Sequence, residues 1–131
     1  RLKSLFAEAR RGAGLGDSQM GVLNAVVESG RAPTVPQIGR SFGQPRQLVQ
    51  RAANSLIDAG LIEALPNPDH KRAVLLQATP RGVALKRAID KLADAKAAEL
   101  AATLDAVMVR DAARMLGEIR RSLETQLRKT V

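Results

Sequence analysis

Hydrophobic residues recur every three or four positions along most of this chain, which is the spacing of one face of an α-helix. The pattern predicts a short amphipathic helix over residues 1–11, a second between residues 17 and 30, a third from Pro36 to Phe42, and a fourth over about residues 45–59. Glycines follow each segment, as expected because glycine readily ends a helix. The first half of the chain should therefore be a cluster of short helices.

The same spacing predicts which positions these helices bury and how they begin. Asp17 or Ser18 can cap the second helix, and Pro36 suits the first turn of the third. We expect the buried face of the third and fourth helices to consist of Ile38, Phe42, Leu48, Val49, Ala52, Ala53, Leu56 and Ile57.

An extended stretch follows the fourth helix. A mostly apolar run at positions 61–65 is followed by a second apolar run at 74–76, and the residues between them include two prolines. This pattern predicts a β-hairpin. Thr79 and Pro80 then supply a cap and a first-turn proline for the next helix.

The rest of the chain reads as two long amphipathic helices with a break near Arg110 and Asp111. The apolar faces of these two helices have no partner within a domain of this size. A second copy of the chain is the simplest partner that could bury them. We therefore expect residues 1–14 and 83–131 to form a dimerisation region around a lobe at residues 15–82. Helical arms that only oligomerise are the alternative interpretation of this region. The residues expected at the dimer contact are Leu5, Met115, Leu116, Ile119, Leu123 and Leu127.

Charge and composition narrow the range of possible functions. The formal net charge is +8, and residues 31–87 alone hold nine basic and three acidic residues, which favours a polyanionic partner. The chain has two aromatic residues, so single-stranded nucleic acid, which stacks on aromatic rings, is a poorer candidate than duplex. With one histidine, no cysteine and scattered carboxylates, we expect no enzyme activity, no metal site and no cofactor. No apolar run approaches the roughly 18 residues of a membrane span, and we expect a soluble cytoplasmic protein.

Two neighbouring elements carry groups suited to duplex DNA. A polar helix face with Arg and Gln is usually only solvated, and a loop histidine such as His70 is more often exposed than functional. Here a short turn precedes the helix and a basic hairpin follows it, which favours a helix in the major groove beside a ribbon on the phosphates. The candidate DNA-binding residues are Arg40, Gln44, Arg46, Gln47, Gln50, Arg51, His70, Lys71 and Arg72.

Four motifs together resemble the MarR family of bacterial transcriptional regulators: residues 44–51 (QPRQLVQR), residues 56–62 (LIDAGLI), residues 69–72 (DHKR) and residues 78–82 (ATPRG). The resemblance implies a mainly α fold with a small β-hairpin wing, a winged helix-turn-helix with long N- and C-terminal dimerisation helices. It also implies a homodimer on a near-palindromic operator in double-stranded DNA, acting as a repressor that a small phenolic or carboxylate effector relieves.

Two residues depart from the family pattern. Pro45 stands where relatives usually cap the recognition helix with Ser or Thr, so the cap should fall to Gln44. Gly39 replaces an expected alanine in the supporting helix, at a cost of about 1 kcal/mol in helix propensity. The alternative function is a winged helix for protein contact or nonspecific DNA compaction.

Overall fold

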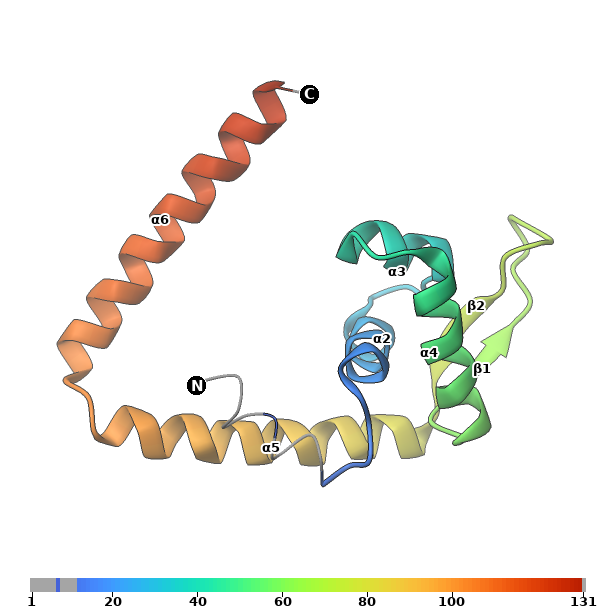
Figure 1. Cartoon of the computed structure of the whole chain (residues 1–131), viewed down its shortest axis with the longest axis horizontal. Helices are drawn as coiled ribbons and strands as arrows, with labels where there is room; N and C mark the ends of the chain where they lie inside the picture. Colours follow the sequence, from blue (N-terminus) through green and yellow to red (C-terminus); the bar gives the residue numbers. More distant parts are fainter. Residues whose placement is uncertain (1–6, 8–11, 131) are drawn as a thin grey trace. The chain divides into compact units, whose positions relative to one another are not determined.

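The structure, a computed structural model, describes residues 7 and 12–130, with side chains to residue 127 (Figure 1). The helix predicted over residues 1–11, apart from Ala7, and the dimer candidate Leu5 lie outside this part. The described elements are α2 (Asp17–Glu28), α3 (Val35–Phe42), α4 (Arg46–Asp58), β1 (Ile62–Leu65), β2 (Leu75–Ala78), α5 (Pro80–Ala102) and α6 (Ala106–Thr130). The predicted fold class, mainly α with one β-hairpin, is confirmed.

The chain divides into two units, Arg1–Ala93 and Asp94–Val131. The first holds the short helices, the hairpin and the start of α5, and the second holds the end of α5 and all of α6. The functional division into a DNA-binding lobe and dimerisation helices stays a prediction.

The core of the first unit lies between α2, α3, α4 and the hairpin. β1 and β2 are antiparallel, with Ile62 opposite Ala78 and Leu65 opposite Leu75. The backbone N–H of Leu76 donates to the carbonyl of Pro33 at 2.8 Å, which ties the start of α3 to the hairpin. The largest fully buried side chains are Leu23, Leu56, Ile62, Leu76, Val22 and Val49.

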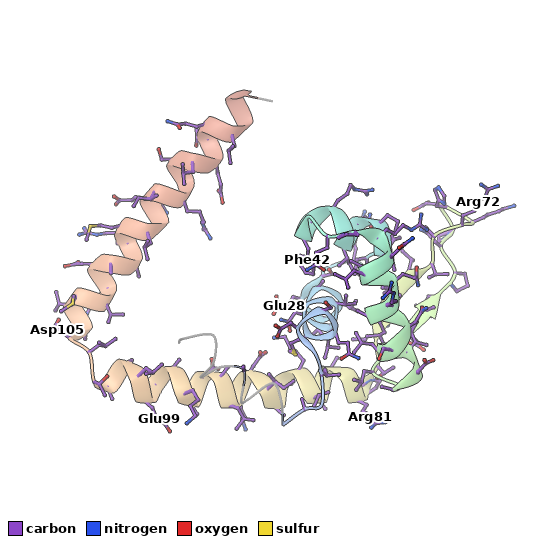
Figure 2. All side chains as sticks on the ribbon, in the orientation of Figure 1. Glu28, Phe42, Arg72, Arg81, Glu99 and Asp105 are labelled. Carbon is purple, nitrogen blue, oxygen red and sulfur yellow. The ribbon has the colours of Figure 1, made fainter. Side chains whose placement is uncertain are left out.

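Two residues predicted to be buried are exposed. Phe42 is 43% exposed and Leu48 is 39% exposed, whereas the other predicted positions of α3 and α4 are buried or half-buried. Phe42 is the last residue of α3 (Figure 2), and its ring atom Cε2 lies 3.5 Å from a Cβ built on Gly21 of α2. Leu48 lies about 90° around α4 from the centre of the buried stripe, at roughly 100° per residue. The spacing therefore predicted the correct buried face of α4 but included a residue at its edge that is exposed.

The join between the hairpin and α5 is unusually close. The Thr79 hydroxyl accepts from the Gly82 N–H at 3.1 Å, which confirms the predicted cap, and donates to the Gly60 carbonyl at 2.8 Å. A Cβ built on Gly82 would overlap the carbonyl oxygen of Leu61 and lie 2.9 Å from its carbonyl carbon. Gly82 is therefore glycine because the first turn of α5 touches the backbone at the start of the hairpin.

The N-cap of α2 is neither Asp17 nor Ser18, the two predicted candidates, but the residue before them. Gly16 is the N-cap, and its N–H donates to Oε1 of Gln19 at 2.7 Å. Asp17 is instead in the first turn, where a carboxylate interacts favourably with the helix dipole.

In the second unit, the break between the long helices lies earlier than predicted. Helix α5 ends at Ala102 and α6 begins at Ala106, so the break expected near Arg110 and Asp111 is wrong. The Asp105 carboxylate accepts from the N–H groups of Val107 and Met108, at 2.8 and 2.9 Å, and so caps α6. A capping side chain overrides an apolar spacing that runs on through the break.

Helix α6 carries its apolar residues on the surface. Met108, Met115, Leu116, Ile119, Leu123 and Leu127 are each 53% to 67% exposed. None of the described helices has the length and apolarity that a membrane span requires.

Candidate nucleic-acid interface

Helix α3 is fixed at both ends by local hydrogen bonds. At its start the Gln37 N–H donates to Oγ1 of Thr34 at 3.4 Å, while the Thr34 N–H donates to Oε1 of Gln37 at 2.8 Å. This reciprocal pair is a capping box. At its end Gly43 has φ 60° and ψ 31°, the left-handed conformation that glycine adopts without strain. The chain can therefore turn sharply into α4.

Gly39 makes that turn tight. The Gln44 N–H donates to the Gly39 carbonyl at 3.0 Å, and a Cβ on Gly39 would lie 3.2 Å from the carbonyl oxygen of Gln44. An alanine here would gain helix propensity but crowd the backbone of the turn. The departure at Gly39 therefore has a packing reason.

Helix α4 begins without a side-chain cap. Pro45 is the N-cap, and its carbonyl accepts from the N–H groups of Leu48 and Val49, at 3.0 and 3.3 Å. No side chain bonds to the first turn, so the prediction that Gln44 caps it is wrong. Pro45 fits because its φ of −58° is the value that the proline ring imposes. The first turn of α4 is exposed, and the N-terminus of a helix favours anions.

The exposed face of α4 brings four predicted residues together. Arg46, Gln47, Gln50 and Arg51 line a hollow of about 420 Å³. Three of these residues are exposed and Gln50 is half-buried. The Gln50 amide Nε2 donates to Oδ1 of Asn54, one turn further along α4, at 2.9 Å.

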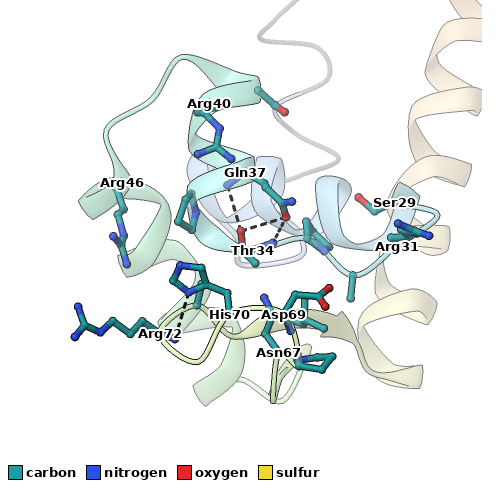
Figure 3. A pocket seen from close by; sticks show the side chains of 17 residues that line it. Ser29, Arg31, Thr34, Gln37, Arg40, Arg46, Asn67, Asp69, His70 and Arg72 are labelled. Atoms are coloured by element: carbon teal, nitrogen blue, oxygen red, sulfur yellow. Dashed lines mark hydrogen bonds between the residues drawn. The ribbon is translucent and has the colours of Figure 1, made fainter.

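A larger groove of about 1250 Å³ lies between α3 and the tip of the hairpin (Figure 3). Four arginines and one histidine line it, against a single carboxylate from Asp69, so its formal charge is +3 with the histidine neutral. The basic lining residues are Arg31, Arg40, Arg46, His70 and Arg72. Of the predicted set, Lys71 is exposed on the same tip but does not line the groove, and Gln44 is exposed in the turn before α4.

Sequence reasoning missed Arg31 as a groove residue. Arg31 lies in the linker between α2 and α3, and only the fold brings it to the hairpin tip. Its position just before the Thr34 capping box is the one signal that could have drawn attention to it.

The hairpin tip is ordered by its own side chains. The Asp69 N–H donates to Oδ1 of Asn67 at 3.0 Å, and the Arg72 N–H donates to Nδ1 of His70 at 3.4 Å. The His70 ring therefore acts as an acceptor, as a neutral imidazole can. It is a structural part of the tip as well as a groove residue.

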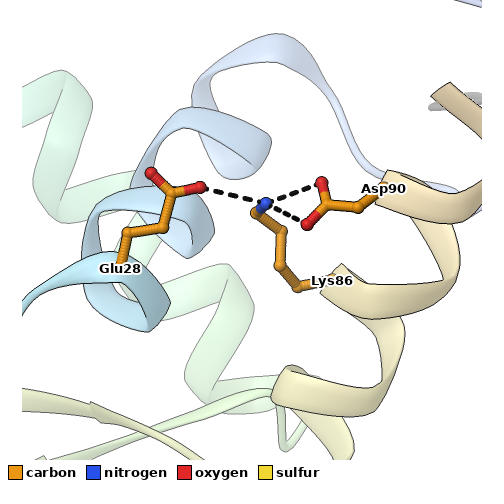
Figure 4. Close-up of polar contacts among 3 residues, drawn as sticks. All are labelled: Glu28, Lys86 and Asp90. Atoms are coloured by element: carbon orange, nitrogen blue, oxygen red, sulfur yellow. Dashed lines mark hydrogen bonds and ion pairs between the residues drawn. The ribbon is translucent and has the colours of Figure 1, made fainter. Parts of the chain in front are cut away.

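A buried lysine links α2 to α5 (Figure 4). The Lys86 side chain is 7% exposed, and its Nζ contacts Oδ2 of Asp90 at 2.5 Å and Oε1 of Glu28 at 3.1 Å. Burial lowers the pKa of Lys86, but hydrogen bonds to Asp90 and Glu28 outweigh it, so the net effect is a raised pKa. This ion triad was not predicted, because its long-range partner Glu28 is invisible to local patterns.

The comparisons with known proteins agree on one family of similar proteins. The sequence model of the MarR family matches residues 13–73, the segment from before α2 to the hairpin tip. A crystal structure of a MarR family transcription regulator superposes with a TM-score of 0.80 and 28% identity, over 97% of this chain and 85% of that one. The chain therefore matches the MarR family in sequence over residues 13–73 and in fold over nearly its whole length. Its fold is that of MarR transcription regulators.

Further MarR structures share this fold at lower identity. Mutant MarR from E. coli, complexed with operator DNA, is 24% identical with a TM-score of 0.71, covering 88% of this chain and 83% of that one. Staphylococcus aureus MarR, in complex with salicylate and kanamycin, is 15% identical with a TM-score of 0.81, covering 93% and 82%.

Among curated proteins, this chain is 44% identical over 90 residues to the uncharacterized protein Rv2011c of Mycobacterium tuberculosis. The alignment covers 62% of this chain and 63% of that relative's length. The same values hold for the uncharacterized protein Mb2034c of Mycobacterium bovis.

Proposed function

We propose that this protein is a dimeric, sequence-specific regulator that binds double-stranded DNA and acts as a repressor relieved by a small ligand. The observation that carries the proposal is the juxtaposition of the uncapped start of α4 with a groove of formal charge +3. Both features favour the binding of phosphate groups, because a helix N-terminus attracts anions and arginines pair with phosphate oxygens.

Base reading and phosphate binding would be divided between the two elements. Gln47 and Gln50 project from the face of α4 beside Arg46 and Arg51, so α4 can present amides to base edges in the major groove. Arg72, with Lys71 beside it, lies on the hairpin tip at the other side of the groove, where a wing would meet the backbone. The match to a MarR solved with operator DNA supports this arrangement.

Dimerisation would come from residues 1–14 and 83–131. The apolar stripe of α6 supports it, because side chains such as Leu116 and Leu123 stay more than half exposed within one chain. A twofold axis would place two copies of α4 in successive major grooves about 34–36 Å apart, so the operator would be a near-palindrome.

The proposal that a ligand relieves repression is based on the structures of similar proteins. S. aureus MarR was solved with salicylate, and we propose that this chain likewise responds to a small effector. The effector would shift the spacing of the two lobes of the dimer. A thiol switch is not open to this chain, because it contains no cysteine.

Selection of bound sequences from a random duplex pool tests the proposal. A specific regulator should enrich a near-palindrome and bind it at least about a thousandfold better than random duplex. Equal binding to all duplexes would instead indicate a DNA-compaction protein, and no binding would favour a winged helix used for protein contact.

Two single changes separate base reading from phosphate binding. Gln47→Ala should weaken binding to the selected site by about 1–3 kcal/mol and leave random duplex nearly unaffected. Arg72→Ala should weaken both and reduce the slope of log K against log salt by about 0.9 per phosphate contact. Arg87→Ala, an exposed arginine of α5 outside the groove, removes the same charge and should change little. Equal losses from Arg72→Ala and Arg87→Ala would contradict a role for the groove.

A further inference from the structure

The hydrogen bond between Gln50 and Asn54 constrains one of the two glutamines on the α4 face. Gln50 Nε2 donates to Asn54 Oδ1 at 2.9 Å, and the two residues are one helical turn apart. Asn54 is exposed, further from the start of α4 than the hollow that Arg46, Gln47, Gln50 and Arg51 line. Asn54 is therefore placed to orient Gln50 without occupying the hollow.

This bond determines what the Gln50 amide can offer to a ligand. A glutamine amide has two N–H donors and one carbonyl oxygen. One donor is used by Asn54, which leaves one N–H and the carbonyl oxygen Oε1. With Asn54 Oδ1 as the acceptor, rotation of the Gln50 amide by a half turn would bring Oε1 against that oxygen, and the bond would form again only if the Asn54 amide turned as well.

One donor beside one acceptor matches a single base edge in the major groove. Adenine presents an acceptor at N7 and a donor at N6, whereas guanine presents two acceptors, at N7 and O6. A held Gln50 amide would pair with both groups of adenine but would place Oε1 against O6 of guanine. Cytosine offers only a donor at N4, and thymine an acceptor and a methyl group.

We propose that Gln50 reads an adenine in each half-site and that Asn54 is the positioning residue that sets this preference. The proposal rests on the proposed DNA-binding function and adds a base identity to it. Bidentate pairing of this kind discriminates against the wrong base by about 5- to 150-fold. A positioning hydrogen bond at an exposed site should account for about three- to tenfold of that factor.

The test is selection from a random duplex pool followed by binding measurements on the selected site and on its single-base variants. Gln50→Ala locates the position that Gln50 reads, because preference should relax there and nowhere else. Asn54→Ala should relax the same position by about three- to tenfold. Alanine is the better helix former at an exposed helical site, so this variant should fold.

Asn54→Asp separates positioning from direct contact. Aspartate keeps the acceptor for Gln50 Nε2, so the adenine preference that is relaxed in Asn54→Ala should be restored in Asn54→Asp. Its negative charge should at the same time lower affinity for every duplex, because on the proposed DNA-binding face it would repel the phosphates. A role of Asn54 in folding alone would move affinity and preference together in all variants.

Several results would overturn the inference while leaving DNA binding intact. These are a base other than adenine at the Gln50 position, an unchanged preference there in Asn54→Ala, or relaxation at a different position, which would mean that Asn54 reads a base itself. A wild-type protein with no sequence preference would overturn the proposed function, and the base assignment with it.

Discussion

Replacing Gly82 with alanine should destabilise the first unit strongly, although the change adds a single methyl group. The new Cβ would overlap the Leu61 carbonyl oxygen and lie 3.4 Å from the Leu61 Cα, so α5 and the start of the hairpin must separate. The Thr79 N–H donates to that same Leu61 carbonyl at 3.1 Å, and the single proton of the Thr79 hydroxyl is shared between this carbonyl, at 3.1 Å, and that of Gly60. A shift that relieves the overlap therefore stretches two hydrogen bonds.

The magnitude follows from these contacts. Overpacking costs about 1–3 kcal/mol, and two weakened hydrogen bonds add about 2 kcal/mol. Alanine recovers about 1 kcal/mol of helix propensity. We therefore expect Gly82→Ala to lower the free energy of unfolding by about 2–4 kcal/mol, a large part of the roughly 5–15 kcal/mol of a typical domain.

Urea unfolding followed by circular dichroism, at one fixed protein concentration, measures the effect. Gly30→Ala is the matched control, because a Cβ at Gly30 meets nothing within 4 Å and the residue does not need a positive φ. It should change stability by no more than about 0.5 kcal/mol. If Gly82→Ala were as mild as Gly30→Ala, the close approach of α5 to Leu61 would not exist in solution.

Two further predictions concern the ion triad and the α6 stripe. Lys86→Met should fold with stability near that of the wild type at neutral pH, because methionine fills the buried space and the freed carboxylates of Glu28 and Asp90 are 67% and 51% exposed. The raised pKa of Lys86 means that its contribution is complete below the ordinary value of 10.5 and is lost as pH rises through the raised value. Urea unfolding at pH 9 and pH 11 should thus show a larger alkaline loss in the wild type than in Lys86→Met, and equal losses would contradict the triad. Leu123→Glu should give monomers or unfolded chain by light scattering, since it buries an unpaired charge in the proposed dimer contact. Arg121→Glu, on the opposite face of α6, should stay dimeric, and a folded dimer of Leu123→Glu would rule out this interface.

Local patterns predicted most of the fold because the signals are short-range. The end of α3 at Gly43 and the cap of α5 at Thr79 each depend on residues close in the sequence, and both were predicted. Periodicity was less reliable at edges. It placed Leu48 inside the core, because spacing gives the direction of a side chain but not how far the neighbouring elements extend over it.

The parts of the site that could not be predicted depend on distant segments. Arg31 joins the groove only because the hairpin tip folds back beside the start of α3. Lys86 reads as one more cation on a helix, and only the packing of α2 against α5 gives it Glu28 as a partner. The contact that fixes Gly82 is similar, since it is with the backbone of Leu61 across the whole hairpin.

The start of α4 breaks a rule that the other described helices follow. Side chains bond to the first turns of α3, α5 and α6, from Thr34, Thr79 and Asp105, and Gln19 bonds back to the N-cap of α2. Helix α4 has Pro45 there and no such bond, although a capping side chain would contribute about 1 kcal/mol. Local rules are most often broken at functional sites, where a ligand supplies the missing partner. A DNA phosphate has the oxygen acceptors that the exposed N–H groups of α4 lack, so the absent cap is itself an argument that this helix end was shaped for binding.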